Sequence, residues 1–376
     1  MTSERGSNVS TIQAPAEITT GRTFPHHYFS GTHRAIGEQF GEACRDLIHR
    51  HRDKVLSRLG EKNGLARDEA LDKAMAYRPY VLQYAAFFDD EIQGMAHASG
   101  LSLPEAYLLQ LRAEAATPVL DDDTNECTTF AVQPEATVNG IGLVGQNADL
   151  PAFYGEIAIT AEIRADDQPA ILMVLPAGQV SYIGINDRGL GVFANFVTCD
   201  GWRKGFPRYF LSRLALTEDT VDGAIERVRS VRRASSRNLI MLDSHGTAAD
   251  LETTPTRDAR LDPENGLLAH SNHYVHESLH DEERSADKNV SNSRVRLQQM
   301  RDLLAANHGQ LDAERMQTIL RDRTCHPDTL CRMPGDDPDS DTITFASVIA
   351  EPSEGRMWVA VGPPNENPYV LLEFSA

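Results

Sequence analysis

The spacing of apolar residues changes near residue 120, and this change constrains the fold more than any other feature of the sequence. Before it, apolar residues recur at helical spacing over residues 32–59 and again over residues 69–98. A third helix is predicted after residues 102–105, where a capping serine, a first-turn proline and an early glutamate stand together. Gly37 and Gly41 lie four residues apart on one helix face, which predicts a close contact between two helices.

An acidic stretch without periodicity, residues 121–126, separates this helical part from short β-rich runs. Those runs cover residues 128–132, 142–147, 156–163, 170–175, 182–185 and 191–196. Beyond them the pattern predicts helices at 207–216, 221–231, 293–306 and 313–322, and strands at 238–242, 248–252, 342–350, 357–361 and 369–374. Strand blocks flanked by helix blocks predict an α+β layered domain with a mostly antiparallel sheet.

Composition narrows the class of protein. The 376 residues include 55 acidic and 36 basic ones, a formal net charge of −19 at pH 7, which disfavours nucleic-acid and membrane-surface partners. Five scattered cysteines without a C-x-x-C pair indicate a reducing compartment. The polar N-terminus lacks the apolar core of a signal peptide, and no apolar run approaches the roughly 20 residues of a membrane span. We therefore expect a cytoplasmic protein with no membrane association.

Cys127 stands where the acidic stretch meets the first β-rich run, an unusual position because free cysteines are mostly buried within elements. A lone cysteine is nevertheless often structural, and position alone leaves both interpretations open. Several short motifs accompany it in order along the chain. They are Gly31 to Gly41, Cys127-Thr128-Thr129, Gly145-Gln146-Asn147-x-Asp149, Gly184-x-Asn186-x-x-Gly189-Leu190 followed by Asn195, and His270-Ser271-Asn272-His273.

Together these motifs resemble the acyl-coenzyme A:6-aminopenicillanic acid acyltransferase family of N-terminal nucleophile hydrolases. The resemblance implies a four-layer αββα sandwich and a precursor that cuts itself before the cysteine. Residues 1–126 and 127–376 would then be two subunits that stay associated as an αβ heterodimer, with further oligomerisation left open. The implied activity is that of a cysteine amidase or acyltransferase, which acts without a cofactor on small N-acyl amides through a thioester on Cys127.

The chemistry suits a cysteine at a chain terminus, because the freed α-amino group has an ordinary pKa of about 7.7–8.0 and can take the thiol proton. By resemblance, Asp149 lies close to the new terminus, and the side-chain N–H of Asn272 helps to hold the oxyanion. Further candidates for substrate or oxyanion contacts are Thr128, Asn147 and Asn195, of which the two asparagines suit turns equally well.

The sequence departs from the fungal member of the family in two places. Glu126 precedes the expected cut where that enzyme has glycine, and residues 339–345 contain no arginine where it carries one. The penicillin substrate and coenzyme A of that enzyme are therefore not carried over. Arg188, Arg237 and Arg332 are the candidate replacements, and the sequence does not rank them.

Other constellations are weaker. The histidines of residues 270–280 and the group Cys325, His326 and Cys331 lack the second ligand cluster that a zinc site needs, so we expect no metal. Gly184 and Gly189 lack the further residues of a nucleotide-binding loop. Two alternatives remain: an acylase like choloylglycine hydrolase, in which the cysteine follows the initiator methionine, and an uncleaved αββα binding module without catalysis.

Overall fold

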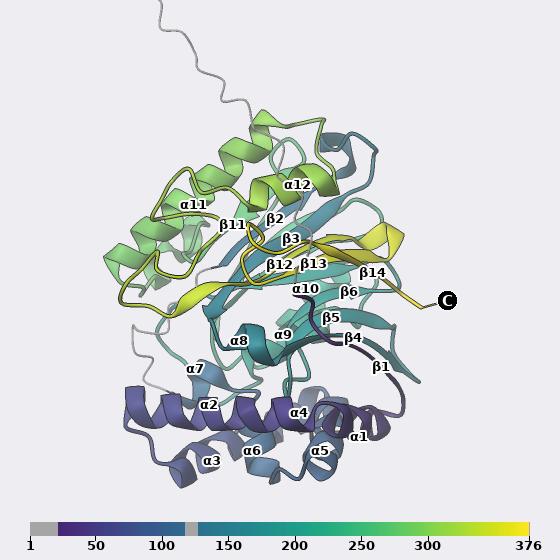
Figure 1. Cartoon of the computed structure of the whole chain (residues 1–376), viewed down its shortest axis with the longest axis vertical. Helices are drawn as coiled ribbons and strands as arrows, with labels where there is room; N and C mark the ends of the chain where they lie inside the picture. The colour runs from purple at the N-terminus through teal and green to yellow at the C-terminus, as the bar shows by residue number, and fades with distance from the viewer. Residues whose placement is uncertain (1–21, 117–126, 376) are drawn as a thin grey trace, which may run out of the picture.

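The computed structural model describes residues 22–116 and 127–375 as two β-sheets stacked face to face, with helices on both outer sides (Figure 1). Strands β2 and β3 of one sheet contact β7 and β8 of the other, which places the sheets against each other. This arrangement confirms the predicted α+β class and the αββα order of layers.

The larger sheet has eight strands in the order β1-β4-β5-β6-β7-β8-β9-β10. Only the edge pair β1 and β4 is parallel, and the other neighbours are antiparallel. Its strands are β1 (His26–Gly31), β4 (Ala158–Ala165), β5 (Ile171–Pro176), β6 (Ile183–Asn186), β7 (Gly191–Asn195), β8 (Arg237–Leu242), β9 (Ala248–Thr253) and β10 (Asp258–Leu261).

The smaller sheet has six antiparallel strands in the order β11-β2-β3-β12-β13-β14. These strands are β2 (Cys127–Val132), β3 (Leu143–Pro151), β11 (Leu267–His270), β12 (Thr342–Glu351), β13 (Arg356–Val361) and β14 (Val370–Glu373). The register of β12 against β3 shifts between Thr344 and Ala346, directly beside Asp149. Such an irregularity redirects a side chain locally.

Helices cover the outer face of each sheet. The larger sheet is covered by α1 (His33–Ala43), α9 (Arg208–Ala215) and α10 (Val221–Arg229), and the smaller one by α11 (Asp287–Ala306) and α12 (Ala313–Leu320). The other helices are α2 (Arg45–Asn63), α3 (Arg67–Met75), α4 (Arg78–Tyr84), α5 (Ala86–Ser99), α6 (Leu103–Leu108), α7 (Arg112–Ala115) and α8 (Tyr154–Ile157), with short 3-10 turns η1 (Pro134–Ala136), η2 (Glu277–Glu282) and η3 (Pro352–Glu354). No helix in these ranges has the length and apolarity needed to cross a membrane.

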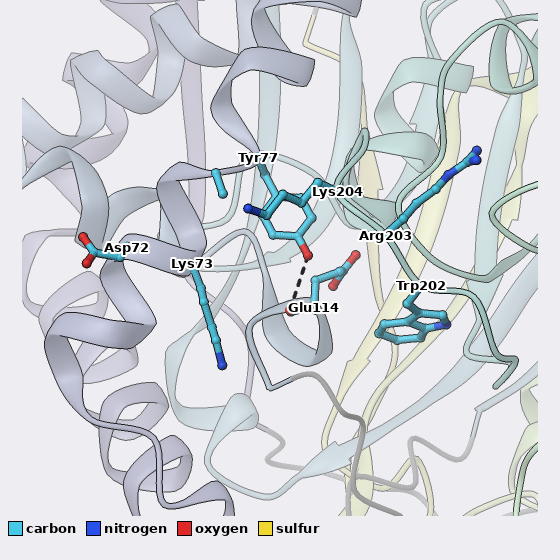
Figure 2. A pocket seen from close by; sticks show the side chains of 8 residues that line it. Asp72, Lys73, Tyr77, Glu114, Trp202, Arg203 and Lys204 are labelled. Carbon is cyan, nitrogen blue, oxygen red and sulfur yellow. Dashed lines mark hydrogen bonds between the residues drawn. The ribbon is translucent and has the colours of Figure 1, made fainter.

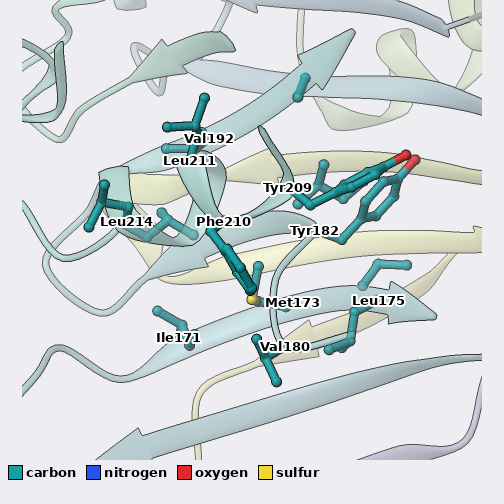
Figure 3. Packing of buried hydrophobic residues seen from close by; sticks show 14 of the residues in the cluster. Ile171, Met173, Leu175, Val180, Tyr182, Val192, Tyr209, Phe210, Leu211 and Leu214 are labelled. Atoms are coloured by element: carbon teal, nitrogen blue, oxygen red, sulfur yellow. The ribbon is translucent and has the colours of Figure 1, made fainter. Parts of the chain in front are cut away.

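The N-terminal helices share the core of the strand-rich part. Strand β1 forms the edge of the larger sheet, and Phe88 of α5 stacks on Phe210 of α9 with ring centroids 4.6 Å apart. Phe210 in turn points toward Met173 of β5 (Figure 3). The two parts of the chain therefore bury one continuous apolar cluster.

The predicted close helix contact is confirmed between α1 and α5. A Cβ atom added to Gly37 would stand 2.0 Å from the carbonyl oxygen of Glu91, and one added to Gly41 would stand 2.5 Å from that of Met95. Only glycine leaves room for the two backbones at this distance.

Some predicted elements differ in detail. The single helix expected over residues 32–59 breaks at Cys44, whose φ of −112° is not helical, and the one expected over 69–98 is three shorter helices. Strands β1, β10 and β11 were not predicted, because short runs rich in histidine or charge carry little β signal.

Candidate active site

Cys127 is the first residue of β2, where it is buried and pairs with Ala148 of β3. Its backbone N–H donates to Oδ1 of Asn272 at 2.7 Å. Its carbonyl oxygen accepts from the Arg296 guanidinium at 2.8 Å and from Nδ2 of Asn195 at 3.0 Å. Both backbone polar groups of Cys127 are therefore held by side chains from distant parts of the chain.

Asn272 reaches Cys127 because β11 pairs with β2 in a register that sets His270 opposite Thr129. The asparagine lies two residues beyond the end of β11, beside the start of β2. Its backbone N–H donates to Oγ of Ser293 at 2.7 Å, and its Nδ2 donates to the carbonyl of Phe196 at 2.9 Å. These bonds leave Oδ1 directed at the nitrogen of Cys127.

Asn195 is the last residue of β7, in the facing sheet, so its position is a strand end and not a turn. Its Oδ1 accepts from Oγ1 of Thr129 at 2.7 Å and from Nδ2 of Asn238 at 3.2 Å. With Oδ1 occupied in this way, its Nδ2 is oriented toward the Cys127 carbonyl.

Asp149 lies on β3 with its carboxyl fully buried. Oδ1 accepts from Oγ1 of Thr344 at 2.7 Å, and Oδ2 has no hydrogen-bond partner among the described residues. Burial raises the pKa of this carboxyl to about 7, against the opposing effects of the Arg296 charge and the Thr344 bond. Near neutral pH the group therefore exists in both protonation states.

The same surroundings act on the thiol of Cys127. Burial, followed by the nearby Asp149 carboxylate, raises the pKa of the thiol to about 11, while the backbone N–H of Asp149 and the charges of Arg296 and Arg237 lower it. In the uncut chain the sulfur is therefore a neutral thiol at pH 7, and it needs a base to become a nucleophile.

Arg296 is a contact of Cys127 that the sequence motifs did not indicate. From α11 it donates to the Cys127 carbonyl and to Oγ1 of Thr128, both at 2.8 Å, and to Oδ1 of Asn272 at 3.0 Å. Desolvation lowers the pKa of this fully buried guanidinium. The available signal was its place on the apolar stripe of α11, at helical spacing from the buried residues Ser293, Met300 and Leu304.

The family model of acyl-coenzyme A:6-aminopenicillanic acid acyl-transferase matches residues 139–366. The chain belongs to this family. The matched residues include Asp149, Asn195, Asn272 and Arg296 and begin after Cys127. Membership confirms the predicted class, an N-terminal nucleophile enzyme that acts on amide bonds.

Solved structures show a weaker likeness. Two variants of the conjugated bile acid hydrolase from Clostridium perfringens are 14% identical and cover 66% of this chain and 97% of theirs, with TM-scores of 0.45 and 0.48. The penicillin V acylase from Agrobacterium tumefaciens is 12% identical and covers 62% of this chain and 83% of its own, with a TM-score of 0.42. A search of the curated proteins gave no significant match.

The side chains of two other candidates, Thr128 and Asn147, bond to residues other than Cys127. Thr128 and Asn147 are cross-strand partners, so their side chains share one face of the sheet. Thr128 accepts from Arg296, whereas Nδ2 of Asn147 donates to the carbonyls of Leu320 and Leu330, both at 2.8 Å. Asn147 thus joins α12 and the loop beyond it to the sheet. Glu126 lies outside the described residues.

The candidate metal-binding histidines contact neighbouring side chains. His270 is buried with Nε2 2.8 Å from Oε1 of Glu252, and His273 Nδ1 lies 2.7 Å from Oγ of Ser293. His326 lies 3.3 Å from Asp336. Across residues 22–116 and 127–375, no three His, Cys, Asp or Glu side chains come together in a way that could hold a metal ion.

The structure separates the three arginines proposed to replace the family arginine. Arg188 is exposed and pairs with Asp219 at 2.8 Å. Arg332 lies beside Thr344, the residue that donates to Asp149: the backbone N–H of Arg332 donates to Oγ1 of Thr344 at 2.9 Å. The side chain of Arg332 is 3.3 Å from Asp337. Arg237 is buried with its charge close to Cys127, and its guanidinium carbon lies 4.7 Å from the ring centroid of Tyr209.

Proposed function

We propose that this chain cuts itself between Glu126 and Cys127, and that the freed Cys127 then cleaves small N-acyl amides through a thioester. The observation that carries the proposal is the hydrogen bond from the backbone nitrogen of Cys127 to Asn272. Cleavage would turn this nitrogen into an α-amino group that Asn272 already holds, within reach of the thiol of the same residue.

The proposed reaction has two halves. The neutral α-amine takes the proton of the Cys127 thiol, the sulfur attacks the amide carbonyl, and the amine product leaves with the transferred proton. Water, or a second amine in a transfer reaction, then attacks the thioester and releases the acyl group. An α-amine with an ordinary pKa of about 7.7–8.0 is partly neutral near pH 7, so no separate histidine base is required.

The surroundings of Cys127 indicate what each neighbouring residue would do in this reaction. Arg296 and Asn195 hold the Cys127 carbonyl and so fix the residue that carries both nucleophile and base. Asp149, which titrates near neutral pH, is the carboxyl that would stabilise the protonated amine. Asn272 would supply the oxyanion donor that the resemblance implies, after its Nδ2 exchanges the Phe196 carbonyl for the substrate oxygen.

Self-cleavage would leave residues 1–126 and 127–376 as an αβ heterodimer. The shared apolar cluster and the placement of β1 at the edge of the larger sheet support continued association of the two pieces. Free thiols at all five cysteines support a reducing compartment such as the cytoplasm.

Trapping the acyl-enzyme by mass spectrometry tests this proposal. Purified protein is incubated with a library of N-acyl amines, quenched in acid, and the fragment containing Cys127 is weighed. We expect acyl additions on Cys127 that hydroxylamine removes, and none in Cys127→Ala. A protein that stays whole and takes up no acyl group would instead favour the uncleaved binding module.

A further inference from the structure

Two buried arginines, Arg208 and Arg237, form a second charged cluster beside the site. Arg208 is the first residue of α9 and Arg237 is the first residue of β8, and both side chains are almost entirely buried. Among the described residues, all three guanidinium nitrogens of Arg208 and Nε of Arg237 lack a hydrogen-bond partner. Buried guanidinium groups normally have their donors satisfied, so these four are unusual.

Within residues 22–116 and 127–375, the charges of this cluster do not balance. The described carboxylate against the pair is Glu114, whose Oε2 lies 3.6 Å from Nε of Arg208. Its other oxygen, Oε1, already accepts from the backbone N–H of Arg208 at 3.0 Å and from Oγ of Ser235 at 2.9 Å. One carboxylate thus faces two buried cations. A buried cation without a full counter-charge is costly, which favours a bound anion in the working enzyme.

Three aromatic rings pack against the guanidinium group of Arg208. The Arg208 guanidinium carbon lies 4.2 Å from the ring centroid of Phe196, 5.1 Å from that of Tyr209 and 5.5 Å from that of Trp202. Tyr182 lies beside Tyr209, with the two hydroxyl groups on the same side (Figure 3). Rings stacked on a guanidinium face leave its N–H edge available to a planar anion.

A pocket of about 420 Å³ lies on the far side of two neighbours of Arg208, although neither Arg208 nor Arg237 lines it. Trp202 and Glu114, the neighbours of Arg208, lie on its wall (Figure 2). The cations Lys73, Arg203 and Lys204 also line it. The carboxylates Asp72 and Glu114 line it too, so three cations stand against two anions, a small positive excess that favours an anionic ligand nearby.

The two arginines are connected to Cys127 through two pairs of residues that are adjacent in the sequence. Phe196, which covers Arg208, follows Asn195 in the chain, and its carbonyl accepts from Asn272. Arg237 precedes Asn238, whose side chain donates to Asn195. An anion held by the two arginines would therefore lie next to the groups that fix Cys127.

We propose that Arg208 and Arg237 form a subsite for a carboxylate on the substrate, so that the enzyme prefers amides that carry a carboxylate to uncharged ones. This inference rests on the proposed function of Cys127. The carboxylate would take bidentate hydrogen bonds from the unpartnered guanidinium donors. It stands on either the acyl or the amine side of the cleaved bond, and the experiment distinguishes the two.

The test uses the acyl-enzyme assay with a library of matched pairs, each a carboxylate and its primary amide. Phenylacetylglycine with phenylacetylglycinamide places the charge on the amine side, and N-benzylsuccinamate with N-benzylsuccinamide places it on the acyl side. We expect the reacting compounds to be carboxylates, with kcat/KM about 10- to 100-fold above their amides, the effect typical of hydrogen bonds to a charged group. The type of pair that shows the preference identifies the side.

Arg208→Met and Arg237→Met should remove this preference, lowering kcat/KM for carboxylates about tenfold more than for the matched amides. Arg237→Met should also slow the amides, because the charge of Arg237 lowers the pKa of the Cys127 thiol. Arg237→Lys, which keeps a charge, should retain part of the preference and shows that the site still matures. Arg188→Met, at an exposed arginine, is the matched control and should behave as wild type.

The outcomes separate the two proposals. Reaction of carboxylates and amides at equal rates, or equal losses for both in the methionine variants, would overturn the carboxylate subsite and leave the role of Cys127 standing. Absence of acylation by every compound would count against the role of Cys127, and the subsite would fall with it.

Discussion

Asp149→Asn should stabilise the uncut protein by an amount that grows with pH, because the wild-type carboxyl is buried without a full set of partners. In the folded protein its pKa is about 7, against 3.8 for an ordinary aspartate. Between these values the folded state keeps a proton that the unfolded state releases. The carboxyl therefore destabilises the fold progressively as pH rises through this window, and the cost levels off above pH 7.

Each pH unit within the window corresponds to 1.36 kcal/mol, so the burial cost is about 3 kcal/mol at pH 6 and about 4 kcal/mol at pH 8. Asparagine keeps the shape of the side chain and removes the titration. The new amide N–H and the lost attraction to Arg296 add effects that change little with pH. The diagnostic quantity is therefore the difference between the two conditions, about 1.4 kcal/mol more stabilisation at pH 8 than at pH 6.

Urea unfolding at pH 6 and pH 8 measures this difference. Cys127→Ala serves as the parent for both proteins, so that the chain remains in one piece, and both conditions keep the acidic chain away from the region of low net charge. A stabilisation that is the same at both pH values, or larger at pH 6, would refute the reasoning that burial dominates the environment of Asp149. The same substitution in the Cys127 protein should impair maturation or turnover.

Arg296→Met should slow both maturation and turnover by about 10²–10³-fold, since it removes the donors to the Cys127 carbonyl and to Asn272. Single-turnover kinetics would measure both rates, and rates within threefold of wild type would exclude a role in the site. Asn195→Ala should likewise reduce the rate of chain cleavage, followed by gel densitometry, and undiminished cleavage would remove it from the site. Gly37→Ala should lower the free energy of unfolding by about 1–3 kcal/mol or more, because its Cβ would overlap the facing backbone. The control Gly60→Ala, in open space within α2, should raise the free energy of unfolding by up to about 1 kcal/mol. Equal effects of the two substitutions in denaturant unfolding would contradict the close packing of α1 and α5.

Much of the fold could be predicted because periodicity is a local property. The β-rich runs after Cys127 and the helices α9 to α12 follow directly from their apolar spacing, and the glycines of α1 report a contact that only close packing explains. The division into two sheets, and the entry of β1 into the larger sheet, depend on pairings between segments more than 100 residues apart in the sequence. Local spacing carries no information about such pairings.

The residues around Cys127 could be predicted where they belong to short motifs. Cys127, Asp149, Asn195 and Asn272 were all candidates, and the structure brings them together. Arg296 was missed because an arginine on a helix is usually a solvated surface residue. Asn147 was included because it shares a motif with Asp149, yet its bonds to the carbonyls of Leu320 and Leu330 give it a structural position.

The N-terminal residue of the large fragment in purified active protein tests the central claim most directly. We predict a polypeptide that begins Cys127-Thr128-Thr129, in equal amount with a piece ending at Glu126, and neither in the Cys127→Ala variant. Full activity in protein that consists of the intact chain, with the nitrogen of Cys127 still in a peptide bond, would contradict it.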